Sequence, residues 1–185
     1  MIRHGESTAN PTLSHAGWSQ VPLTPKGERD ALRAKELLCG ISFDAVYTSD
    51  LIRAMRTKEI ALPDADAKQS PLLREIHVGE LAGKTPDACF ALYGEPYVKN
   101  KKNADYRPYG GENRSDHEAR LVCFLKLLEK QPVARVAAFC HEGTMKRMLE
   151  YTSGLGTPSA QHCRNGGVCI FEYQNKVWTL KEWDL

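Results

Sequence analysis

Short apolar runs alternate with longer segments of mixed polarity along most of the chain. Three runs are typical of strands, residues 44–48, 135–140 and 168–173. Two of these are nearly continuous apolar stretches, as a strand buried on both faces of a parallel sheet requires. A shorter apolar stub, Met1 and Ile2, precedes Arg3. Two residues are too few for a full central strand, so we expect either a weakened sheet here or a longer natural N-terminus.

The segments between the runs predict helices. Thr24 followed by Pro25 indicates a helix start, and this helix should end near Gly40. Further helices are expected over residues 50–62, with Asp50 as the cap, over 115–130 and over 143–152. Strands that alternate with helices of this length predict an α/β fold with a mostly parallel central sheet.

Residues 83–115 differ from the rest, because they are rich in Pro, Gly, Asn and Lys. They predict a lid-like excursion that carries one short helix over residues 86–93. A chain of 185 residues suits one domain with a single core. We therefore expect one domain over residues 1–185.

Composition excludes several classes of protein. The 25 basic and 23 acidic residues leave a net charge of +2 without a basic block, so we expect no nucleic-acid partner. We expect no membrane partner and a cytoplasmic location, because neither a long apolar span nor an apolar leader is present. Cys163, Cys169 and His162 form the tightest Cys/His group, but their spacing fits no common zinc pattern. We expect these cysteines to be reduced core residues, and no metal.

Polar residues follow three of the apolar runs directly, in the segments 3–7, 47–57 and 139–144. Ligands of open α/β sheets bind at the carboxyl ends of the strands. If these strands are neighbours, two histidines and two or three arginines converge on one pocket. Helix N-termini and arginine forks both favour phosphate oxygens. The pattern predicts a phosphate site.

Six segments also carry a family resemblance by their residues, their order and their spacing. They are Arg3-His4-Gly5-Glu6-Ser7 with Asn10, Gly17-Trp18 through Thr24 and Gly27, Ser49-Asp50-Leu51 with Arg53-Ala54, residues 73–80, Gly110-Gly111-Glu112, and His141 with Gly143-Thr144. Over nearly its whole length the chain resembles the histidine phosphatase superfamily, the phosphoglycerate mutase-like group. The resemblance implies a three-layer α/β/α sandwich.

The resemblance further implies phosphomonoester hydrolysis without metal or other cofactor, through a phosphohistidine on His4. A hydrogen bond from the other ring nitrogen of His4 to a backbone carbonyl would set the required tautomer. His141 would neutralise phosphoryl oxygens together with the arginines. The expected phosphate-binding residues are Arg3, Asn10, Arg53 and Gly143.

Protonation of the leaving group requires a carboxyl group. Glu75 matches the acid position of the family, although its context alone favours a surface glutamate beside Arg74. Glu80 is the alternative acid. His15, His117 and His162 have no motif support, and we expect them in loops or on the surface.

The sequence favours a phosphatase of the small bacterial type over a mutase. The mutases have Glu-Arg-x-Tyr at the acid motif, whereas Ile76, His77 and Val78 follow Glu75 here, and no Arg-Arg pair exists. Phosphoglycerate mutase stays open as an alternative. A weakly active module that binds phospho-ligands also stays open, because Glu142 replaces a glycine that commonly follows the second histidine. We expect a small phosphorylated metabolite as the partner, and a monomer or homodimer.

Overall fold

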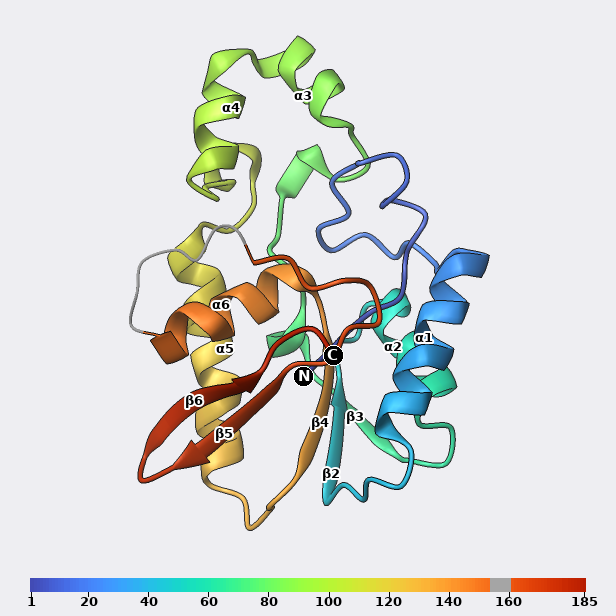
Figure 1. Cartoon of the computed structure of the whole chain (residues 1–185). Coiled ribbons are helices and arrows are strands. Elements are labelled where there is room, and N and C mark those ends of the chain that lie inside the picture. The colour runs from blue at the N-terminus through green and yellow to red at the C-terminus, as the bar shows by residue number, and fades with distance from the viewer. Residues whose placement is uncertain (154–160) are drawn as a thin grey trace.

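A computed structural model describes residues 1–153 and 161–185 of the chain. In this part, four strands form a central sheet in the order β1-β4-β2-β3 (Figure 1). They are β1 (Ile2–Arg3), β2 (Ala45–Thr48), β3 (Ala67–Gln69) and β4 (Val136–Cys140). Each neighbouring pair is parallel. The expected α/β class with a mostly parallel sheet is confirmed.

Helices cover both faces of the sheet (Figure 1). They are α1 (Pro25–Leu38), α2 (Ile52–Ala61), α5 (Arg114–Glu129) and α6 (Glu142–Ser153). Successive strand side chains point to opposite faces. Val46 and Phe139 therefore pack with α1 and α2 in one core cluster, whereas Tyr47 and Ala138 pack with α5 and α6 in another. The three-layer sandwich is confirmed.

The start of α1 agrees with the sequence prediction, whereas the starts of α2 and α5 differ from it in their capping residues. Thr24 accepts a hydrogen bond from the amide of Gly27 and caps α1, as expected. Asp50 does not cap α2, because its carboxylate binds Arg74 instead. Helix α5 begins earlier than expected, since Asn113 forms a capping box with the residue three positions on. None of the described helices has the length and apolar character of a membrane span.

Only the start of the expected strand at residues 168–173 reaches the central sheet, where Val168 forms an antiparallel bridge with Ile2 of β1. Strand β5 (Ile170–Gln174) pairs antiparallel with β6 (Val177–Glu182), which the sequence analysis did not identify as a strand. Most side chains of the two strands are exposed or half-buried. Trp178 still packs against the core cluster beneath α5 and α6. The apolar run thus forms a hairpin that covers one side of the core.

Residues 83–115 contain the expected helix α3 (Pro86–Tyr93) and a second one, α4 (Glu95–Lys102). Gly94 and Pro96 interrupt the helical pattern, which is why α4 escaped prediction. Gly94 has a φ of +60°, which favours glycine, and Pro96 occupies the first turn of α4, where proline is tolerated. Both helices stand away from the sheet (Figure 1).

The loop after β1 lies directly against the first turn of α1. A Cβ atom added to Gly27 would be 2.0 Å from the carbonyl oxygen of Glu6, and one added to Gly5 would be 2.1 Å from the carbonyl oxygen of Gly27. Both glycines are required by this backbone contact and not by a turn. The contact fixes the loop that contains His4.

We expect Gly27→Ala to destabilise the protein by about 1–3 kcal/mol, because the added methyl group must displace backbone atoms. Helix propensity alone would predict that the substitution stabilises the protein by about 0.5–1 kcal/mol. Unfolding in urea measures the difference, with Lys35→Ala on the exposed side of α1 as the control. A Gly27→Ala protein as stable as the wild type would contradict the close contact.

Candidate active site

Three of the polar segments meet at the carboxyl ends of neighbouring strands. Strand β1 leads into His4, β4 leads into His141, and β2 leads into Ser49. Parallel pairing aligns the ends of these strands, since Arg3 is opposite Cys140. The centroids of the two histidine rings are consequently 5.1 Å apart. The structure thus meets the condition on which the predicted phosphate site depended.

His4 has the tautomer that a nucleophile requires. Its Nδ1 lies 2.6 Å from the carbonyl oxygen of Gly5, which can only accept, so Nδ1 carries the proton. The expected backbone partner is therefore present, and Nε2 is left unprotonated. Burial lowers the pKa of His4 well below its usual value, and the positive charges of Arg53 and Arg3 lower it further. The imidazole is neutral at pH 7.

Arg53 is buried in the site, with 1% of its surface exposed. Its Nη1 and Nη2 donate to the carbonyl oxygens of Ser19 and Gly17 at 3.0 and 2.9 Å. These contacts explain the Gly17-Trp18 motif, because the loop orients the arginine. Burial lowers the pKa of Arg53 to about 10, so the side chain remains a cation at neutral pH.

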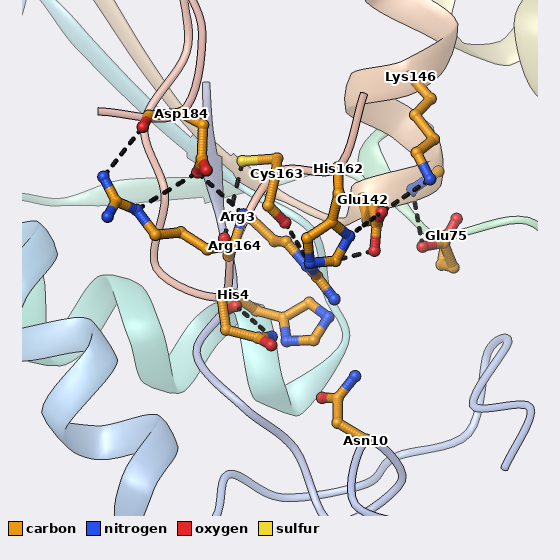
Figure 2. Close-up of polar contacts among 12 residues, drawn as sticks. Arg3, His4, Asn10, Glu75, Glu142, Lys146, His162, Cys163, Arg164 and Asp184 are labelled. Atoms are coloured by element: carbon orange, nitrogen blue, oxygen red, sulfur yellow. Dashed lines mark hydrogen bonds and ion pairs between the residues drawn. The ribbon is translucent and has the colours of Figure 1, made fainter. Parts of the chain in front are cut away.

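Arg3 is held close to His4 (Figure 2). Its Nη1 donates to the carbonyl oxygen of Cys163 and lies 3.0 Å from Oε2 of Glu142. Only 5% of Arg3 is exposed. Two buried arginines therefore lie near the neutral nucleophile candidate.

Three buried nitrogen atoms near His4 have no hydrogen-bond partner among the described residues: Nε of Arg3, Nε of Arg53 and Nδ1 of His141. The other ring nitrogen of His141 lies 2.9 Å from Oγ of Ser49. A buried donor without a partner costs about 1–3 kcal/mol, more when it is charged. A bound anion beside these groups would offset the charges of the two arginines.

The carboxylate of Glu75 reaches the first turn of α6. It accepts hydrogen bonds from the amides of Gly143 at 3.0 Å and Ile76 at 2.9 Å. A Cβ atom on residue 143 would lie 2.0 Å from this carboxylate, so only glycine leaves room for it. In this structure the Gly143 amide donates to Glu75, and binding of phosphate by that amide stays a prediction.

Arg120 holds the segment that carries Glu75. From α5 it donates to the carbonyl oxygens of Leu72, Arg74 and Glu75 and to the carboxylate of Glu112. The Gly-Gly-Glu motif thus has a structural role. Sequence reasoning missed Arg120, since it reads as one more polar residue on a helix.

Asn10 and Glu80 have different surroundings. Oδ1 of Asn10 accepts from the amide and hydroxyl of Ser7, while its amide nitrogen points toward the His4 ring (Figure 2). Asn10 can therefore still donate to a ligand. Glu80 interacts through a hydrogen bond with Tyr93 on α3, and the structure gives it no contact with His4.

The three histidines without motif support differ in burial. His162 is exposed, as expected, and His15 is partly buried, with Nε2 2.7 Å from the Tyr97 hydroxyl. For His117 the surface prediction is wrong. It lies on the face of α5 that packs against α6, is 1% exposed, and has a pKa lowered to about 3 by burial. Its Nε2 lies 3.1 Å from Oγ1 of Thr144, so it is part of the support of the site.

Cys163 and Cys169 are buried free thiols whose sulfur atoms lie 3.9 Å apart. Both belong to the core cluster beneath α5 and α6. The expected packing role is confirmed.

Known proteins share this fold and these motifs. The family model of the histidine phosphatase superfamily (branch 1) matches residues 1–185. The chain is 34% identical over 158 residues to 2,3-bisphosphoglycerate-dependent phosphoglycerate mutase 2 of Gloeobacter violaceus, which covers 80% of this chain and 72% of the relative. It is 40% identical over 172 residues to the 2,3-bisphosphoglycerate-dependent phosphoglycerate mutase of Treponema pallidum, with 80% and 68% covered.

A solved structure is similar over the whole length. The alpha-ribazole phosphatase from Shigella flexneri superposes with a TM-score of 0.87 at 26% identity, covering 100% of this chain and 94% of that one. Together with the order of the motifs around His4 and His141, these matches make the chain a member of the histidine phosphatase superfamily.

Proposed function

We propose that the protein hydrolyses phosphomonoesters through a phosphohistidine on His4. One observation carries the proposal: a neutral imidazole with an unprotonated Nε2 lies among buried cationic and polar groups that have nitrogen atoms without partners in the described part of the chain. Such donors fit the three oxygen atoms of a phosphoryl group. The substrate is a small phosphorylated metabolite, and we place the reaction in the cytoplasm.

In the first step, Nε2 of His4 attacks phosphorus in line with the ester oxygen. The N–P bond forms, the P–O bond breaks, and the leaving alkoxide takes a proton from the carboxyl group of Glu75. Arg3, Arg53 and His141 stabilise the charge on the phosphoryl oxygens. The proton on Nδ1 of His4 stays hydrogen-bonded to Gly5.

In the second step, water attacks phosphorus and the N–P bond breaks. Glu75 takes a proton from the water, so inorganic phosphate leaves and both residues return to their starting states. The carboxylate of Glu75 accepts from the amide of Gly143, two residues after His141, and this position is suited to both transfers. Asn10 supplies a further donor to the phosphoryl group.

The mutase alternative is favoured by the two relatives named above. A mutase would return the phosphoryl group of His4 to a phosphoglycerate instead of water. Incubation with 3-phosphoglycerate and catalytic 2,3-bisphosphoglycerate distinguishes mutase from phosphatase activity. A mutase forms 2-phosphoglycerate at a higher rate than it releases inorganic phosphate. Phosphate binding without turnover of any monoester would support the binding module instead.

The proposal predicts phosphate release from p-nitrophenyl phosphate that EDTA does not change. His4→Ala should lower kcat by about a thousandfold or more, because the covalent route is lost. Arg53→Ala should lower kcat/KM by about a hundredfold. Acid-labile ³²P retained by the wild type but not by His4→Ala identifies the intermediate. Undiminished activity of His4→Ala would refute the mechanism.

The lowered pKa of His4 predicts its titration. A histidine whose pKa lies below 6.5 stays neutral as the pH falls through 6.5, and gains its proton only in more acidic solution. In phosphate-free buffer, the ring signal of His4 should therefore not shift between pH 7.5 and 5.5 in NMR spectra. His4→Ala assigns the signal. A midpoint near pH 6.5 would contradict burial of the neutral ring.

The role of Glu75 predicts a dependence on the leaving group. Glu75→Gln keeps an acceptor for the Gly143 amide but removes the proton donor. Hydrolysis of an alkyl phosphate should fall by about a hundredfold or more. Formation of the phosphoenzyme from p-nitrophenyl phosphate, whose phenolate leaves without a proton, should fall much less in rapid-quench measurements. Equal losses with both substrates would argue against proton transfer by Glu75.

A further inference from the structure

Glu142 places a carboxylate beside a site that would bind an anion. It is the first residue of α6 and directly follows His141. Its Oε2 lies 3.0 Å from Nη1 of Arg3, and its Oε1 lies 2.7 Å from both Nζ of Lys146 and Nδ1 of His162 (Figure 2). The side chain is 19% exposed. Glu142 thus links a buried arginine of the site to two groups nearer the surface.

The contacts show why this charge is tolerated. Burial alone would raise the pKa of Glu142, but Arg3 and Lys146 outweigh that effect and the pKa is lowered. The carboxylate is therefore ionised at neutral pH. Its charge is balanced by Arg3 on one oxygen and by Lys146 on the other.

The same contacts determine how Arg3 is held. Its two acceptors among the described residues, the carboxylate of Glu142 and the carbonyl oxygen of Cys163, both bind Nη1. Nε has no partner among the described residues. Because the guanidinium is planar, fixing Nη1 on one side also fixes the direction in which the remaining N–H groups point. A long side chain without such an anchor keeps rotamer freedom, which a ligand must then remove on binding.

We propose that Glu142 is a positioning residue for Arg3. The Glu142 carboxylate orients the guanidinium of Arg3 toward the phosphoryl group. It also offsets part of the positive charge of Arg3, so that inorganic phosphate is released readily. This inference rests on the proposed function. Arg3 and Arg53 both carry positive charge into the pocket, and Glu142 reduces the net attraction for a dianion. Hydrolysis ends with phosphate in that pocket, so weaker attraction favours turnover.

Substitutions of Glu142 can separate the orientation of Arg3 from the reduction of positive charge. Glu142→Gln keeps an oxygen that can accept from Arg3 but removes the charge. Glu142→Ala removes both. Glu150→Gln is the matched control, because Glu150 lies on the same helix, is 8% exposed and pairs with Arg114 and Arg147. Each protein is tested by calorimetry with inorganic phosphate and by steady-state kinetics with p-nitrophenyl phosphate.

Glu142→Gln should bind inorganic phosphate about threefold to tenfold more tightly, the change expected when one charge several ångströms from a dianion is removed. Its kcat should fall as phosphate release slows. Glu142→Ala should lose about tenfold or more in kcat/KM, because Arg3 is no longer oriented. Glu150→Gln should leave the phosphate Kd and KM within twofold of the wild type, whatever it does to stability.

The inference is overturned if the phosphate Kd of Glu142→Gln stays within twofold of the wild type, or if Gln and Ala variants behave alike. If Glu142→Gln does not fold, Glu142→Asp is used to test the proposal. It keeps the charge but shortens the side chain, so kcat/KM should fall while the phosphate Kd is unchanged, and a tighter Kd would refute the proposal. A wild type that binds phosphate without hydrolysing esters would refute only the proposed function, whereas one that binds no phosphate would refute both.

Discussion

The burial of two arginine charges beside a neutral histidine is the constraint on which the site depends. Arg3 and Arg53 are almost fully removed from solvent, and each retains a nitrogen atom without a partner among the described residues. Two cations buried near each other are unfavourable, and a bound anion would offset their charge. Burial and, after it, the same charges hold the pKa of His4 low, so the conditions that favour phosphate also keep the candidate nucleophile unprotonated.

Much of the surrounding structure holds these charges in place. Backbone carbonyls of residues 17 and 19 orient Arg53, while the carbonyl of Cys163 and the carboxylate of Glu142 orient Arg3. Arg120 binds three carbonyl oxygens of the segment that ends at Glu75. Several family motifs thus contribute orientation, since contacts that are formed before substrate binds need no reorganisation during the reaction.

The sequence predicted the features that depend on local patterns. The run at residues 135–140 predicts a buried strand because it is almost entirely apolar, and Thr24 with Pro25 predicts the start of α1. Predictions from local patterns were wrong where a contact with a residue far away in sequence determines the position of a side chain. Asp50 was expected to cap α2, yet a bidentate contact with Arg74 takes its carboxylate. His117 was expected at the surface, yet the packing of α5 on α6 buries it.

By itself the sequence determined the fold class, the order of the polar segments and the residue types that could attack or bind a phosphoryl group. Those properties follow from hydrophobic periodicity and from side-chain chemistry, which are local. Only the tertiary structure decided which donors remain available. The amide of Gly143 already donates to Glu75, whereas the Nε atoms of Arg3 and Arg53 have no partner in the described part of the chain. Hydrogen-bond partners come from segments far apart in sequence. Whether a donor has a partner is therefore determined only in the folded chain, where the ends of the strands lie side by side.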